Sequence, residues 1–159
     1  MNVVKTIGHR FLHGIVFGAI YFVLESLWKG HPTDWRMFVL SALIGLMMGL
    51  INDVFPRDTD LRLQCFVGLM IALLAECICG YQWNIIEGLG LWNYSNPPLS
   101  YLSAVGGQIN IIFAAMWYGL SFVCILLDDC MCYYLGHHGE RPYYKVGDKI
   151  WLLLPKRNS

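Results

Sequence analysis

The stretch LQCFVGLMIALLAECICGYQW, from Leu63 to Trp83, decides the fold of this chain, because it is apolar throughout except for Gln64, Glu76 and its polar end. A helix rises 1.5 Å per residue, so about 20 such residues cross the roughly 30 Å hydrocarbon core of a bilayer. Three further apolar stretches have a similar length: about Phe11–Trp28, Met37–Phe55 and Ala104–Leu127. The sequence therefore predicts an all-α integral membrane protein with four transmembrane helices.

The composition agrees with a lipid environment. Of 159 residues, 57% are hydrophobic and 14% are charged, whereas a soluble domain carries about 25% charged residues. These values exclude a soluble enzyme and a disordered tail, and the lack of a basic block excludes a nucleic-acid binder. Several of the six cysteines lie in apolar runs, where Cys behaves as a small hydrophobic residue, so no disulfide framework is expected. No small-residue cleavage site follows the first apolar run, so we expect it to be a retained anchor.

Lys and Arg are unevenly distributed around the four stretches, and this bias predicts the orientation. With a cytoplasmic N-terminus, the outer side carries only Lys29 and Arg36. The inner side then carries Lys5, Arg10, Arg57, Arg62, Arg141, Lys145, Lys149, Lys156 and Arg157. Both termini are therefore predicted to be cytoplasmic, in the cell membrane if the source is bacterial.

Two segments outside the helices have a distinct character. Residues 84–103 lack Lys and Arg and are rich in Gly, Asn, Pro and aromatic residues, so we expect an interfacial or re-entrant segment between helices 3 and 4. Residues 128–159 are predicted to be a short cytoplasmic tail that follows a transmembrane domain of residues 1–127. In this tail, Tyr143–Val146 and Lys149–Leu152 flank a Gly-Asp pair and predict a β-hairpin. An isolated hairpin is marginally stable, so we expect it to pack on the membrane surface or a partner.

Polar residues within the helices indicate a candidate site. An uncompensated charge at mid-bilayer costs roughly 2.5–3.5 kcal/mol, so Glu25 and Glu76 are functional candidates. With the predicted orientation both lie in the outer half of the bundle, at a depth similar to that of Gln108 and Asn110. Each lies on the small-residue face of its helix, which packs against other helices. The candidate ligand-binding residues are Glu25, Glu76, Gly80, Trp92, Asn93, Tyr94, Ser95, Gln108, Asn110 and Trp117. The structural alternative is that the polar groups fix helix register and the Trp residues anchor the interface.

The sequence predicts no cofactor and no metal centre. The candidate metal ligands of the tail are Cys130, Cys132, His137 and His138, but Cys-x-Cys departs from the usual zinc spacing. His9 and His13 are helical neighbours that lack the glutamate of a His-Glu-x-x-His metal helix.

Part of the chain resembles a known membrane family. The runs are Leu74–Gly80, Leu91–Ser95, Gly107–Ile109 and the later Trp117. They resemble the ABC-transporter type IV permease family, whose vertebrate members are the transmembrane protein 229 group. The resemblance covers residues 8–127 and includes His13-Gly14 and Glu25. It implies a small multi-pass membrane protein with a transporter-like role.

Two positions depart from that family pattern. Ala75 replaces the Trp before the glutamate, and Asn93 replaces the Asp between Trp92 and Tyr94. A charge-based role of that Asp is therefore lost in this chain, whereas a hydrogen-bonding role is retained.

Three functions remain open at this point. The first is a transport or permease-type component, with an outward-facing site formed by Glu25, Glu76, Asn110 and the 92–95 loop. Four spans are few for a carrier, so we expect a homo-oligomer or a partner membrane subunit, for which two Gly-x-x-x-Gly motifs (residues 14–18 and 45–49) offer contact faces. The second is a membrane-embedded enzyme that acts on a lipid or lipophilic substrate with Glu76 as acid or base. The third is a non-catalytic accessory subunit.

Overall fold

A computed structural model describes residues 3–135 and 140–157 of the chain. Four long helices run the length of the molecule: α1 (Val3–Lys29), α2 (Trp35–Gly49), α4 (Leu61–Gly80) and α5 (Ile111–Cys130). The short α3 (Ile51–Val54) continues α2, and π-helical turns over Tyr81–Ile86 and Met131–Leu135 continue α4 and α5. Within the described residues, four helical segments are long and apolar enough to cross a membrane, which confirms the prediction of four long apolar helices.

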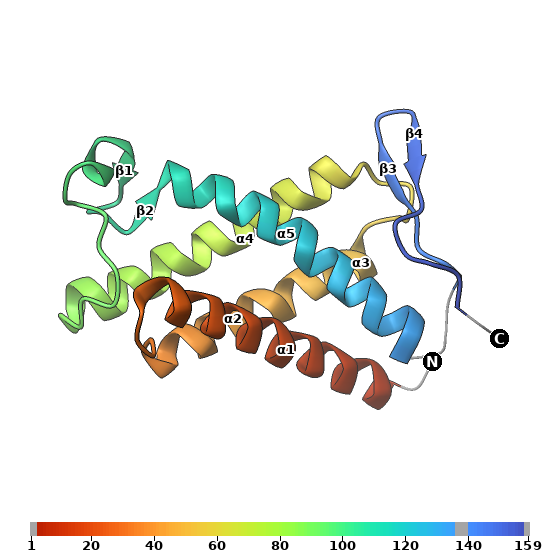
Figure 1. The fold of residues 1–159 in the computed structure, drawn as a ribbon, viewed down its shortest axis with the longest axis horizontal. Helices are drawn as coiled ribbons and strands as arrows, with labels where there is room; N and C mark the ends of the chain where they lie inside the picture. The colour runs from red at the N-terminus through yellow and green to blue at the C-terminus, as the bar shows by residue number, and fades with distance from the viewer. Residues whose placement is uncertain (1–2, 136–139, 158–159) are drawn as a thin grey trace.

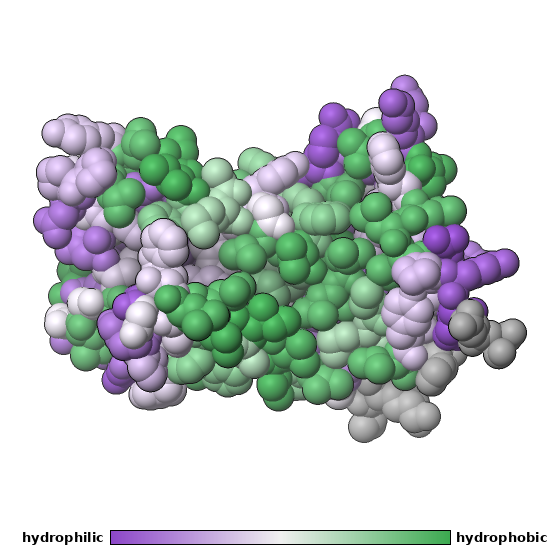
Figure 2. All heavy atoms as spheres, in the orientation of Figure 1, coloured by the Kyte–Doolittle hydropathy of each residue, from purple (hydrophilic) through white to green (hydrophobic). Residues whose placement is uncertain are grey.

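The surface of the molecule has a hydrophobic middle and two hydrophilic ends. Figure 2 shows hydrophobic side chains over the helices and hydrophilic ones gathered toward the two ends of the long axis. Large apolar side chains on every long helix are exposed, among them Ile15, Leu43, Leu74 and Ile112. A soluble monomer rarely exposes so large a contiguous apolar surface. The surface therefore suits lipid contact around the middle of the bundle.

Glycines allow α1 and α2 to pack closely. A Cβ added at Gly18 lies 2.8 Å from Ala42 Cβ, and one at Gly45 lies 2.8 Å from Phe17 Cβ. Small residues permit this approach of two helix backbones in a bundle. Both Gly-x-x-x-Gly motifs are thus used inside the chain, so an oligomer needs a different contact face.

Helices α4 and α5 form the second closely packed pair. A Cβ added at Gly68 lies 2.6 Å from Ser121 Oγ, and the Ser121 hydroxyl donates to the Trp117 carbonyl on its own helix. The buried core joins the two pairs. Its central members are Phe17, Ile44, Met48, Ala72, Trp117 and Cys124.

The end of the bundle that carries residues 81–110 is called the loop end below. Here the strands β1 (Ser103–Ala104) and β2 (Ile109–Asn110) form a small antiparallel pair. Gly106 and Gly107 connect them with positive φ angles, a conformation that L side chains rarely adopt. The Asn110 side chain then accepts the Ile112 amide as the N-cap of α5. The fourth helix consequently begins at Ile111, not at Ala104 as the apolar run predicted.

The opposite end, called the tail end, carries the start of α1, the end of α5 and the C-terminal hairpin (Figure 1). The strands β3 (Tyr144–Val146) and β4 (Lys149–Trp151) are antiparallel and flank Gly147-Asp148, which confirms the predicted hairpin. The Asp60 carboxylate accepts the Gly147 amide at 2.7 Å. The hairpin therefore packs on the residues that begin α4. At the same end, helical structure of the fourth span continues beyond Leu127 to Leu135.

Candidate functional site

Glu76 lies inside the bundle and contacts α5. Its side chain comes from the last turns of α4, and the residue is 5% exposed. Trp117 Nε1 on α5 donates to Glu76 Oε1 at 2.9 Å. The Trp117 ring in turn stacks on Tyr21 of α1, with ring centroids 5.3 Å apart. Side chains of α4, α5 and α1 thus follow one another in contact at this point, whereas Gln108 and Asn110, predicted at a similar depth in the fourth helix, lie before its start.

Glu25 occupies a different environment near the end of α1. Lys29 Nζ lies 2.6 Å from Glu25 Oε1, and the Thr33 hydroxyl donates to the same oxygen at 3.3 Å. Lys29 also reaches the Leu91 carbonyl, so the pair connects α1 to the loop end. One oxygen of Glu25 therefore has a structural role in holding the loop.

The second carboxylate oxygen of Glu25 and that of Glu76 have no hydrogen-bond partner among the described residues. Within the described residues, the buried side-chain atoms that lack a hydrogen-bond partner are Glu25 Oε2, Glu76 Oε2 and His13 Nδ1. A buried polar group without a partner is costly, and the cost is higher for a charged group. At these three atoms a ligand or a proton would supply the missing hydrogen-bond partner.

A second polar group surrounds Gln108. Asn84 Nδ2 donates to Gln108 Oε1 at 2.7 Å, and Trp92 Nε1 donates to the Gln108 carbonyl at 3.1 Å. A Cβ added at Gly80 lies 2.7 Å from Gln108 Oε1, so glycine at this position gives the amide its space. Sequence reasoning missed Asn84, whose Oδ1 also accepts the Leu91 amide. Asn84 had no signal beyond its polar character at the end of an apolar helix.

The remaining candidates stabilise the loop-end turns. The Asn93 carboxamide accepts the Ser95 amide, an Asx-turn contact within the loop. The Asn110 amide donates to the Leu99 carbonyl and to the Ser103 hydroxyl while its oxygen caps α5. These contacts use both side-chain polar atoms of Asn110 and the side-chain oxygen of Asn93 in the local fold.

Tyr94 packs on the first turn of α5. Its ring stacks on Phe113 with centroids 4.6 Å apart, and burial raises the pKa of its phenol. The Tyr94 phenol therefore stays protonated across the physiological range. The position fits an anchoring role at the loop end.

A dense charge cluster, which sequence reasoning missed as a unit, lies at the tail end. Arg10 of α1 donates from Nε and Nη2 to the Asp53 carboxylate at 3.0 and 2.6 Å. Its Nη1 donates to Asp128 Oδ1 on α5, and Asn52 Nδ2 donates to Asp128 Oδ2 at 2.8 Å. The Asp128 side chain is 1% exposed. Arg10 was counted as a flanking charge and Asp128 as the end of a helix, because local spacing does not show that the two meet.

The tail-end cluster borders a cavity of about 290 Å³. Its lining includes His9, Arg10, Asp128 and Cys132 from the helix ends and Tyr144 from the hairpin. The Tyr144 hydroxyl donates to Asp129 at 2.8 Å, and burial with the nearby carboxylate raises the pKa of Tyr144. The hairpin therefore forms one wall of this cavity.

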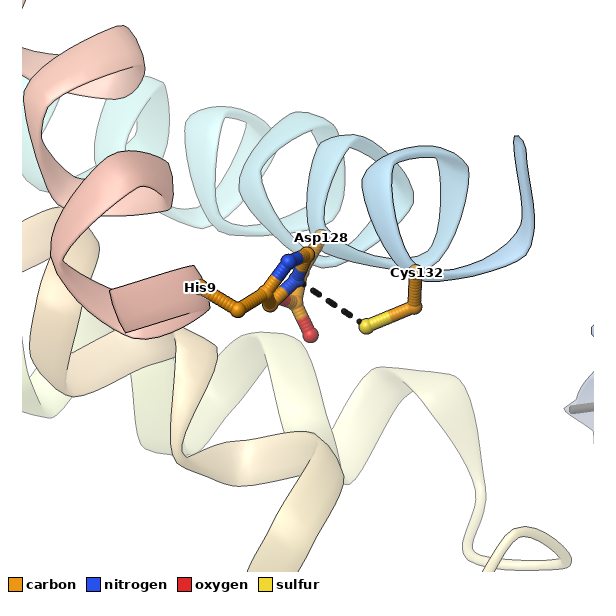
Figure 3. Close-up of side chains that lie close together, drawn as sticks. All are labelled: His9, Asp128 and Cys132. Atoms are coloured by element: carbon orange, nitrogen blue, oxygen red, sulfur yellow. Dashed lines mark hydrogen bonds and ion pairs between the residues drawn. The ribbon is translucent and has the colours of Figure 1, made fainter. Parts of the chain in front are cut away.

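One cysteine and one histidine of the tail end lie close together. Cys132 Sγ lies 3.1 Å from His9 Nε2, and both lie next to Asp128 (Figure 3). Cys130 is not part of this group among the described residues, while His137 and His138 lie outside the described residues. The structure thus pairs Cys132 with the histidine of another helix rather than with its Cys-x-Cys neighbour.

Comparisons with family models, with curated proteins and with solved structures found no match to this chain. The functional argument therefore depends on the geometry of the chain itself.

Proposed function

We propose that this protein is a small multi-pass membrane protein that acts as a transport-type component, with Glu76 as the binding group for a small cation, the proton included. The observation that carries the proposal is the buried Oε2 atom of Glu76, which has no hydrogen-bond partner in residues 3–135 and 140–157, although Trp117 donates to Oε1. In an apolar interior a carboxylate favours a neutralising partner strongly.

The surroundings of Glu76 favour a cation over an anion or a neutral polar ligand. Trp117 presents its N–H edge to the carboxylate and its face to Tyr21, so the open side of the site is the unpartnered oxygen Glu76 Oε2. Glu25, which is paired with Lys29, provides a second buried carboxylate oxygen in the same half of the bundle. The negative charge of Glu76 therefore attracts positive charge.

The orientation and the assembly belong to the same proposal. The Lys and Arg bias of the sequence favours cytoplasmic termini, so the Glu76 half of the bundle faces outward. The resemblance to the ABC-transporter type IV permease family supports a transport role. Because the glycine motifs pack α1 on α2, an oligomer or a partner subunit docks on another helix face.

The enzyme and accessory-subunit alternatives make different demands. An enzyme that uses Glu76 as acid or base needs a second reacting group nearby, and Trp117 is the side chain that the described residues show bonded to Glu76. An accessory subunit needs Glu76 only for helix packing. In that case Glu76 responds to pH as any buried carboxyl does, but no metal or organic cation changes the stability of the protein through it.

Thermal unfolding of the purified protein tests this proposal. Wild type, Glu76→Gln and the control Glu87→Gln are compared in detergent with sodium, potassium or tetramethylammonium chloride at several pH values. Glu87 is exposed at the loop end and accepts from Gln82, so Glu87→Gln removes the same charge as Glu76→Gln but leaves the buried site unchanged. A ligand at a hundredfold excess over Kd stabilises the native state by about 2.7 kcal/mol.

We expect a cation or proton to raise the melting temperature of wild type and Glu87→Gln but not of Glu76→Gln. Equal responses of all three proteins contradict a site at Glu76. A Glu76→Gln protein that melts lower and a wild type that responds to no metal or organic cation support the accessory-subunit alternative.

A further inference from the structure

Three side chains with metal-binding atoms converge at the tail end, far from Glu76 along the bundle. His9 comes from the start of α1, Asp128 from the last turn of α5, and Cys132 from the π-helical turn that follows (Figure 3). His9 Nε2 lies 3.1 Å from Cys132 Sγ and 3.5 Å from Asp128 Oδ1. All three donor atoms lie within 4.8 Å of one another.

These separations match a shared metal ion. Zinc binds His nitrogen at about 2.0 Å and Cys sulfur at about 2.3 Å, so ligand atoms of a tetrahedral site lie roughly 3.3–3.6 Å apart. The imidazole, thiolate and carboxylate donors are the set that zinc and its first-row neighbours accept, whereas magnesium and calcium prefer oxygen alone. The chemistry of the donors therefore indicates a transition metal.

The hydrogen bonds of His13 supply an independent observation. His13 is 0% exposed, and its Nε2 lies 3.2 Å from the Cys124 carbonyl, which can only accept. The carbonyl contact favours the tautomer with its proton on Nε2, in which Nδ1 presents a lone pair. Among the described residues this Nδ1 has no hydrogen-bond partner, and it lies 4.0 Å from Asp128 Oδ1. A buried lone pair beside a carboxylate is stabilised by positive charge nearby.

The charge balance of the cluster leaves Asp128 available to a cation. Arg10 donates to the carboxylates of both Asp53 and Asp128, so the three groups together carry one net negative charge. Arg10 Nη1 and Asn52 Nδ2 also donate to Asp128 and fix its orientation. Hydrogen bonds of this kind commonly orient the side chains that bind a metal ion. Asp129, next in sequence, adds further negative charge to the cavity lining.

We propose that the tail end of this protein is a binding site for a divalent transition metal, ligated by His9, Asp128 and Cys132. The cavity of about 290 Å³ that His9, Asp128 and Cys132 line provides the entry path for the ion. The site lies on the opposite end from Glu76, so it does not depend on the function proposed above.

Metal titration of the full-length protein in detergent tests the site. The protein is stripped with a chelator and titrated with Co²⁺, whose thiolate complexes absorb in the near ultraviolet and visible range, and zinc content is measured by mass spectrometry after dialysis. Cys132→Ser and His9→Gln remove one ligand each. The controls are Cys130→Ser, which removes the neighbouring thiol, and His31→Gln, which removes an exposed imidazole at the other end.

We expect one Co²⁺ per chain, a cobalt–thiolate absorption band, and retention of both in Cys130→Ser, His31→Gln and Glu76→Gln. Affinity should fall at least tenfold in His9→Gln, and the thiolate band should disappear in Cys132→Ser. Wild-type protein that binds no metal, or binds it without a thiolate band, overturns the proposal without any variant. A band that persists in Cys132→Ser and disappears in Cys130→Ser overturns it as well.

Discussion

The two ends of the bundle bury charge in different ways. At the tail end, Arg10 donates to the carboxylates of Asp53 and Asp128, and Asn52 also donates to Asp128. In the loop half, Glu76 has one hydrogen bond from a neutral indole and no cation paired with it. An ion-pair network holds helices together whether or not a ligand binds, whereas a carboxylate with an unpartnered oxygen is stabilised when a ligand binds to it. The comparison therefore assigns a helix-linking role to the Arg10 network, next to the proposed metal ligands, and an unmet binding capacity to Glu76.

The strongest way to break this comparison is to remove Arg10. In Arg10→Met, Asp128 is left buried without its cation, and we expect the free energy of unfolding to fall by about 3–5 kcal/mol. Asp53→Asn should cost about 1 kcal/mol or less, because the Asp53 side chain is 39% exposed. Equilibrium unfolding in mixed micelles measures both. Equal losses contradict a buried network centred on Asp128.

Trp117→Phe sharpens the loop-half side of the comparison. The variant keeps the ring that stacks on Tyr21 but removes the N–H that donates to Glu76. A hydrogen bond to a charged group contributes roughly 1.5–3 kcal/mol, and we expect a loss in this range. In a Glu76→Gln background the loss should shrink. A double-mutant cycle by thermal unfolding provides the measurement, and purely additive losses contradict the contact.

Gly18→Ala tests the scaffold that the two ends share. The new Cβ lies 2.8 Å from Ala42 Cβ and 3.0 Å from its Cα, so the two helices must separate. Overpacking of this kind costs about 1–3 kcal/mol. Gly119→Ala is the matched control, because no atom lies within 4 Å of its added Cβ. A Gly18→Ala protein as stable as the control contradicts the close packing of α1 on α2.

The smallest expected effect concerns the hairpin at the tail end. The Arg62 guanidinium and the Gly147 amide hold the pKa of Asp60 well below its usual range. A depressed pKa stabilises the docked hairpin above the ordinary carboxyl pKa of about 3.9, and this contribution is lost as the pH falls below it. The Gly147 amide resonance in an acid titration by NMR should follow that loss. In Asp60→Asn the resonance should start at its low-pH position and not titrate.

The sequence predicted the helices and turns that depend on the local pattern of residues. Hydropathy located four helices, and the Gly147-Asp148 pair located the hairpin turn. The predicted start of the fourth helix was wrong. Gly106 and Gly107 have positive φ angles, so this part of the apolar run belongs to the loop and not to the helix. The glycine spacing of residues 14–18 and 45–49 was recognised, but its partner within the chain was not.

The candidate sites were predictable only where a residue type and its place on its own helix indicated them. Glu76 was singled out as an ionisable residue within a span and Trp117 as a residue on the small-residue face of the fourth helix, and the two are in contact. The contacts of Arg10 with Asp128 and of His9 with Cys132 join residues 118 and 123 positions apart. No local spacing encodes such pairs, since they depend on how α1 lies against the end of α5.

The most direct test of the central claim is infrared difference spectroscopy of the protein in lipid, recorded across pH and on addition of sodium or tetramethylammonium ions. We predict a carboxyl band that grows as the pH falls and diminishes when a bound cation replaces the proton, present in wild type and Glu87→Gln and absent in Glu76→Gln. A carboxyl band that does not respond to cations, or that persists in Glu76→Gln, contradicts the assignment of Glu76 as the binding group.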